Sequence, residues 1–86
     1  MTMEQQVEQF IDVIAVLSEM VADNNVPKNV RLAMNDLVSV LNSGDEQSIK
    51  VHEALNILDT ISNDINLDSY SRTQMFSIIS ILENMK

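Results

Sequence analysis

His52 is the side chain of this sequence best suited to proton transfer, because an unperturbed imidazole titrates near neutral pH. A two-metal carboxylate centre in a helical bundle needs Glu three residues before each of its histidines, and residue 49 is Ile. His52 also lies far from the apolar stripe of its own helix, counted at about 100° per residue. We interpret it as a solvated histidine or one at the edge of an interface.

Carboxylates and hydroxyls are the other groups that could do chemistry. Glu4, Glu8 and Asp12 share one helix face, but no second ligand face is visible, so we predict a solvated acidic stripe that binds divalent cations weakly at most. A serine nucleophile needs a base and an oxyanion hole, and a chain with one glycine lacks the loops that build them. We therefore expect no enzyme, no catalytic or metal-binding residue and no cofactor.

The charge balance limits the possible partners. Thirteen acidic and five basic side chains give a formal net charge of −8, which repels nucleic acid. The longest apolar run, residues 13–17, is too short to span a bilayer, and Glu4 and Glu8 stand where a secretory signal carries positive charge. Cysteine is absent, as suits a reducing compartment. We expect a soluble, cytoplasmic chain that binds neither nucleic acid nor membrane.

Four amphipathic helices must position these residues, because apolar side chains recur at helical rather than alternating spacing. The first helix is predicted over about residues 3–23, and the second runs from Pro27 to a stop at Gly44. The third ends at a break over 63–68, and the fourth begins near Ser69. Ser43 with Glu46, or Asp45 alone, is the expected cap of the third helix. The predicted core positions in chain order are Val7, Phe10, Ile14, Leu17, Val21, Val30, Met34, Leu37, Leu41, Val51, Ala54, Leu55, Leu58, Ile61, Met75, Ile78, Ile79, Leu82 and Met85.

An internal repeat is the most informative feature of the sequence. A shift of 41 residues aligns the two halves without a gap, placing Asn25 over Asn66, Arg31 over Arg72 and Met34 over Met75. Such a period predicts an all-α fold: four antiparallel helices in two tandem HEAT-like helical hairpins, packed as a compact four-helix bundle. We expect one domain over 1–86, with repeats over about 3–42 and 44–83. Two unrelated amphipathic hairpins of similar length are the alternative.

The first hairpin resembles a HEAT unit. The likeness is carried by the residues around the turn and the second helix, which are Asp23, Pro27, Val30, Arg31, Ala33 and Leu37. The resemblance implies that the Asp caps the turn and pairs with the Arg eight residues later, which gives Asp23 with Arg31 and Asp64 with Arg72 as structural pairs. The second copy departs from the pattern, because Asp68 replaces the Pro and Ser71 the Val.

Nearly the whole chain also resembles a family of short, acidic, all-helical archaeal proteins catalogued only as an uncharacterised protein family. The stretches 25–31 and 71–73 carry this likeness. It implies an archaeal cytosolic origin and a helical fold, and it supplies no activity to carry over.

A non-enzymatic protein–protein interaction module is the function we expect, acting on a protein partner or as a homo-oligomer, because stacked helical hairpins present a helix face to another chain. The alternative is a small acidic regulatory protein that binds a basic partner or a cation. The fourth helix has apolar side chains beyond its core stripe, which makes it the first candidate surface, and the first helix is the second. The interface candidates are Phe76, Ile81, Ile11, Val13, Val16 and Met20. Loops that wrap over these flanks would be the competing explanation.

Overall fold

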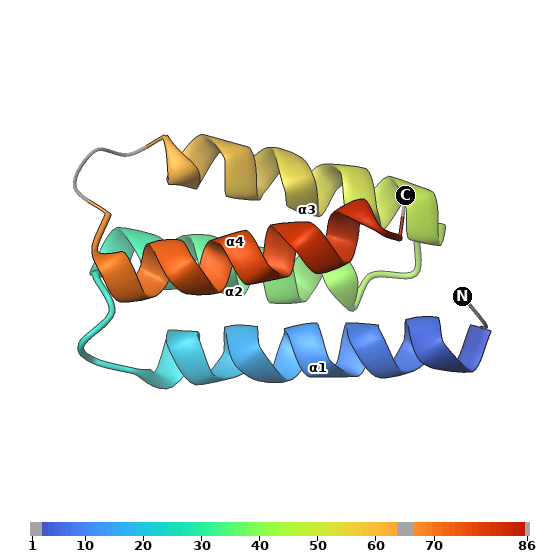
Figure 1. Ribbon diagram of the computed structural model, residues 1–86, viewed down its shortest axis with the longest axis horizontal. Helices are drawn as coiled ribbons and strands as arrows, with labels where there is room; N and C mark the ends of the chain where they lie inside the picture. The colour runs from blue at the N-terminus through green and yellow to red at the C-terminus, as the bar shows by residue number, and fades with distance from the viewer. Residues whose placement is uncertain (1–2, 64–66, 86) are drawn as a thin grey trace.

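Four α-helices build the part of the protein that the computed structural model describes, which is residues 3–63 and 67–85. Helix α1 spans Met3–Ala22, α2 Lys28–Leu41, α3 Gln47–Ser62 and α4 Ser69–Glu83. Successive helices alternate in direction along the long axis of the molecule (Figure 1). The described ranges contain no strand, and the prediction of an all-α chain of four helices is confirmed.

The helices pack as a closed ring. Helix α1 contacts α2, α2 contacts α3, α3 contacts α4, and a smaller contact between α1 and α4 completes the ring. The particle measures 36 × 22 × 21 Å, as expected for a compact bundle. None of the described helices is long and apolar enough to cross a membrane.

A single aliphatic core fills the centre of the ring. In α2 the four predicted positions are all buried, and in α3 and α4 the predicted stripes are buried or packed against the core. Among the described residues, seven of the eight buried positions of the first half recur as buried positions 41 residues later, and Met20 is the exception. These pairs are Val13 and Ala54, Leu17 and Leu58, Val26 and Leu67, Val30 and Ser71, Met34 and Met75, Leu37 and Ile78, and Leu41 and Leu82.

Helix α1 is rotated relative to its predicted orientation. Val7, expected in the core, is 52% exposed, whereas Val13 and Met20, expected at an interface, are 1% and 0% exposed. Apolar residues cover so much of this helix that the sequence defines no single inward face. The contacts with α2 and α4 select the face through Val13, Leu17 and Met20 as the core-facing one.

Lys50, near the start of α3, contacts the end of α2, the turn that follows it, and α1. Its Nζ donates hydrogen bonds to the carbonyl oxygens of Leu41 at 3.4 Å and Ser43 at 3.5 Å, and it lies 5.4 Å from the ring centroid of Phe10. A cation at the C-terminal end of α2 also offsets the negative end of the helix dipole. The contact therefore orients α1, α2 and α3 together.

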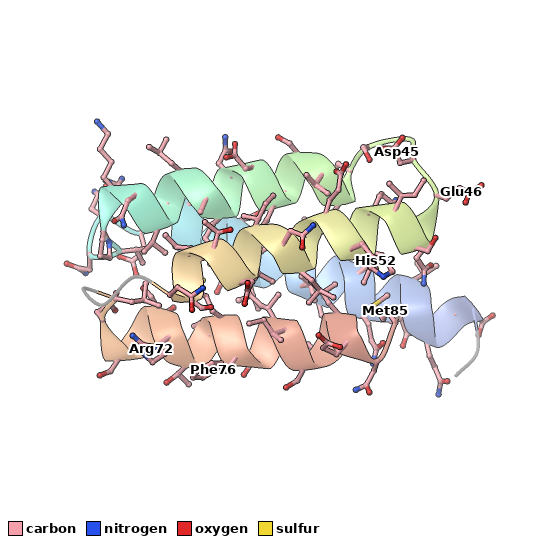
Figure 2. The ribbon with its side chains drawn as sticks, turned by 90° about the horizontal axis from the view of Figure 1, so that it is seen from above. Asp45, Glu46, His52, Arg72, Phe76 and Met85 are labelled. Atoms are coloured by element: carbon pink, nitrogen blue, oxygen red, sulfur yellow. The ribbon has the colours of Figure 1, made fainter. Side chains whose placement is uncertain are left out.

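The predicted cap of α3 is wrong. Glu46 occupies the N-cap position without a side-chain hydrogen bond, and Ser43 Oγ instead donates to Asp45 Oδ2 within the turn, at 3.5 Å. Figure 2 labels Asp45 and Glu46 in this turn between α2 and α3. Helix α3 thus begins without the stabilisation that a side-chain cap provides.

Helix α4 begins at a true side-chain cap. Asp68 is its N-cap residue, and its Oδ2 accepts the backbone N–H of Ser71 at 3.1 Å. The Ser71 hydroxyl, followed by the Ser71 backbone N–H, lowers the pKa of the Asp68 carboxyl. The hydroxyl is buried close to the carboxylate but does not meet strict hydrogen-bond geometry. Asp68 stands at the repeat position of Pro27, the N-cap of α2, which has no side-chain cap bond.

We predict that Asp68→Ala lowers the free energy of unfolding by about 1 kcal/mol, while Asp68→Asn, which can still cap, changes it by a few tenths of a kcal/mol at about neutral pH. Because the folded-state pKa is lowered, the contribution of the charged carboxylate is complete above the unfolded pKa of about 3.9. It is lost as the pH falls through the folded-state pKa. Urea unfolding at a series of pH values should show a steeper acid loss for wild type than for Asp68→Asn, and parallel profiles would contradict this role.

Candidate interaction surface

The residues with catalytic potential lie apart from one another. His52 is exposed on α3, with Nδ1 2.6 Å from the carbonyl oxygen of Ser48 one turn earlier. Glu8 and Asp12 border a shallow hollow on α1 that is lined only by residues of that helix. In the ranges 3–63 and 67–85, no group of three or more His, Asp or Glu side chains is placed to hold a metal ion.

An open groove of about 260 Å³ runs between α3 and α4. Leu55 and Ile79 supply its apolar floor, and both pack against the core. Its polar lining comes from His52, Asn56 and Asp59 of α3 and from Glu83 of α4. The groove therefore combines an apolar floor with two carboxylates at its rim, which suits an apolar side chain followed by a cation.

Phe76 is the main apolar feature on the outside of α4. It is 55% exposed, whereas its neighbour Met75 is 1% exposed in the core. Figure 2 shows Phe76 and Arg72 on the same helix, one turn apart. A half-exposed Phe retains apolar surface whose burial by a partner contributes about 1 kcal/mol or more.

A second row of side chains runs along α4 beside the core stripe, and we call it the outer stripe. Its members are Arg72, Phe76, Ile79 and Glu83, spaced four, three and four residues apart. At about 100° per residue they fall within an arc of roughly 60°. This is the spacing with which one helix packs along another. Ile79 and Glu83 also line the groove, so the outer stripe faces the α3 side of α4.

The structure separates the predicted interface residues into three groups. Phe76 and Ile11 are exposed, at 55% and 60%. Ile81 and Val16 are partly buried and pack against the core. Val13 and Met20 belong to the core itself, so neither is available to a partner.

The turn before α2 corrects the expected partner of Arg31. The Asp23 carboxylate accepts the backbone N–H of Asn25 at 2.9 Å and thereby closes its own turn. Arg31 reaches the same turn but contacts Asn24, with Nη1 donating to Oδ1 at 3.5 Å. The Arg31 Nε is buried without a hydrogen-bond partner in the described part of the chain. Asp23 is already used by the backbone, so the guanidinium meets an amide instead of a carboxylate.

Arg72 occupies the equivalent position in the second half. Asp64, the predicted partner of Arg72, lies outside the described residues. The side chain of Arg72 is partly buried on α4. Arg72 is therefore placed on the outer stripe as a cation.

Sequence reasoning did not identify Leu55 and Asp59 as members of a surface site. The spacing of Leu55 predicts a core position, and a lone Asp on a polar helix face carries no signal. Both matter only because α4 packs beside α3 in the ring. The pairing of helices, which the repeat suggests but does not specify, would have been needed to find them.

Arg31→Ala should lower the free energy of unfolding by about 1 kcal/mol or less, the range of a weak or exposed contact rather than of a buried ion pair. Chemical denaturation of Arg31→Ala and Asn24→Ala would measure it. A loss of about 3 to 5 kcal/mol would contradict this geometry and restore the buried Asp23 pair.

Comparison with known proteins places the chain in a family. A UPF0147 protein from Methanocaldococcus jannaschii is 39% identical over 85 residues, which cover 96% of this chain and 91% of the relative. A UPF0147 protein from Thermoplasma volcanium is 37% identical over 96% of this chain and 92% of its own length. The crystal structure of a UPF0147 protein from Thermoplasma acidophilum matches with a TM-score of 0.89 and 32% identity, covering 94% of this chain and 96% of that one. The model of the family matches residues 1–85, and the chain therefore belongs to the uncharacterised protein family UPF0147.

Proposed function

We propose that the protein is a non-enzymatic interaction module that binds a protein chain through the outer stripe of α4 and the adjoining groove. The observation that carries the proposal is Phe76, a large apolar side chain left 55% exposed on a helix whose inward face is fully used by the core. An exposed aromatic residue beside a groove with an apolar floor is a typical anchor position in protein interfaces.

The charge distribution supports the same surface. The chain carries a formal net charge of −8, yet Ser69–Glu83 contains only one basic and one acidic residue, Arg72 and Glu83. Interface centres are poor in charged residues, because burying a charge costs free energy unless it is paired. The outer face of α4 is therefore the helix surface of this acidic protein that a partner covers at the smallest electrostatic cost.

The HEAT-like relation of the two hairpins is part of the proposal. Helix α2 begins and ends at Lys28 and Leu41, and α4 at Ser69 and Glu83, so their starts differ by the repeat offset of 41 residues. The buried positions follow the same offset, which supports two related hairpins over about 3–42 and 44–83. By analogy with stacked hairpins, the last helix presents its outer face to another chain. We also propose a cytoplasmic location, which the cysteine-free composition suits.

A photo-crosslinking amino acid placed at position 76 should capture a protein partner in cells that express the protein. The matched control carries it at Ser39, an exposed position on α2. Capture at 76 but not at 39 is the expected result. When a lysate of these cells is irradiated instead, capture at 76 should persist in high salt because apolar contacts are not screened. Equal labelling at both positions would contradict an α4 interface. Labelling that disappears with salt would favour the acidic regulatory alternative.

A further inference from the structure

We propose that the outer stripe pairs with the outer stripe of a second copy of this chain, with the two α4 helices antiparallel about a twofold axis. This inference rests on the proposed function and names the occupant of its surface. It follows from the order of the side chains along α4: a cation in the first turn, an apolar pair in the middle and a carboxylate in the last turn.

The order of charges decides the direction of the pairing. In a parallel pair, Arg72 would face Arg72 and Glu83 would face Glu83, and like charges oppose association. In an antiparallel pair, Arg72 of each copy meets Glu83 of the other, so both charges are matched twice. Within one chain the two residues are three turns apart, a rise of about 16 Å, which rules out the same contact inside a single helix.

The apolar residues give the same register. When Arg72 lies opposite Glu83 of the second copy, Phe76 lies opposite Ile79, because both pairs are symmetric about the point between residues 77 and 78. Ile79 forms the floor of the groove together with Leu55 of α3. Phe76 of one copy therefore enters the groove of the other. One twofold axis satisfies the charged and the apolar contacts at once, as an isologous interface requires.

The acidic rim of the groove favours the same occupant. Asp59 and Glu83 both line the groove, so two carboxylates stand at its rim. Arg72 of the second copy brings a guanidinium to this rim, and a planar fork of donors suits carboxylates. The acidic row of Glu4, Glu8 and Asp12 lies on α1, a helix that does not line the groove, so pairing through α4 does not require those rows to meet.

Charge reversal with mixing tests the register directly. Wild type should associate reversibly to a dimer in sedimentation equilibrium between micromolar and millimolar concentration, because two helices and their grooves form a small interface. Arg72→Glu alone and Glu83→Arg alone should each weaken self-association about tenfold or more, since each places like charges together twice. An equimolar mixture of the two variants should restore dimers to within about threefold of wild type, because every charged pair is then complementary.

The control is Arg31→Glu, which makes the same charge change at the repeat-equivalent position on α2. It should leave the dimer constant close to that of wild type, and circular dichroism should show all variants folded. A wild type that stays monomeric at millimolar concentration overturns the proposal, and so does a mixture that associates no better than its separate variants. A monomeric wild type that still captures other proteins at position 76 would overturn self-pairing alone and leave the proposed function intact.

Discussion

The burial of one aliphatic core among four short helices is the constraint on which the rest of this structure depends. A chain of 86 residues buries only just enough apolar surface to be stable, so each helix has to give its most continuous apolar face to the centre. Leu17, Met34, Leu58 and Leu82, one from each helix, are all 0% exposed and show that the four faces meet. Whatever apolar surface remains after this core is complete is available for contact with other molecules.

The sequence determines the inward faces of α2, α3 and α4 but not that of α1. In α2 the residues Val30, Met34, Leu37 and Leu41 recur at helical spacing on one side of the helix, so the helix period predicts a single buried face. Around Val13, by contrast, apolar residues occupy most of the circumference, and periodicity alone leaves the rotation of α1 undefined. The contacts with α2 and α4 settle it, and these depend on how the helices pair in space rather than on any local pattern. The local hydrogen bonds are equally hard to predict from the sequence. The Asp23 carboxylate could accept from a backbone N–H of its own turn or from Arg31, and it accepts from the nearby backbone N–H of Asn25.

The candidate surface on α4 is predictable from the sequence only in part. The apolar excess of α4 is visible in the sequence, and Phe76 is exposed in the structure as that excess implies. Ile81, the other flank of the same arc, turns toward the bundle and packs against its core. The groove beside Phe76 required α3 as a neighbour, which no pattern within α4 indicates. A function that depends on a surface formed by two helices is therefore harder to predict from the sequence than a function that depends on a local motif.

Helix α4 has an inward stripe that packs in the core and an outer stripe, with Phe76 as its most exposed apolar side chain, that we propose a partner covers. Met75 and Phe76 are neighbours in the chain and fall on opposite sides of this division. The most direct test compares the free energy of unfolding of Met75→Ala and Phe76→Ala by urea denaturation at a concentration low enough for the monomer. We expect a loss of about 2 to 5 kcal/mol for Met75→Ala and about 1 kcal/mol or less for Phe76→Ala. Losses of equal size would mean that Phe76 is a core residue and would contradict the division.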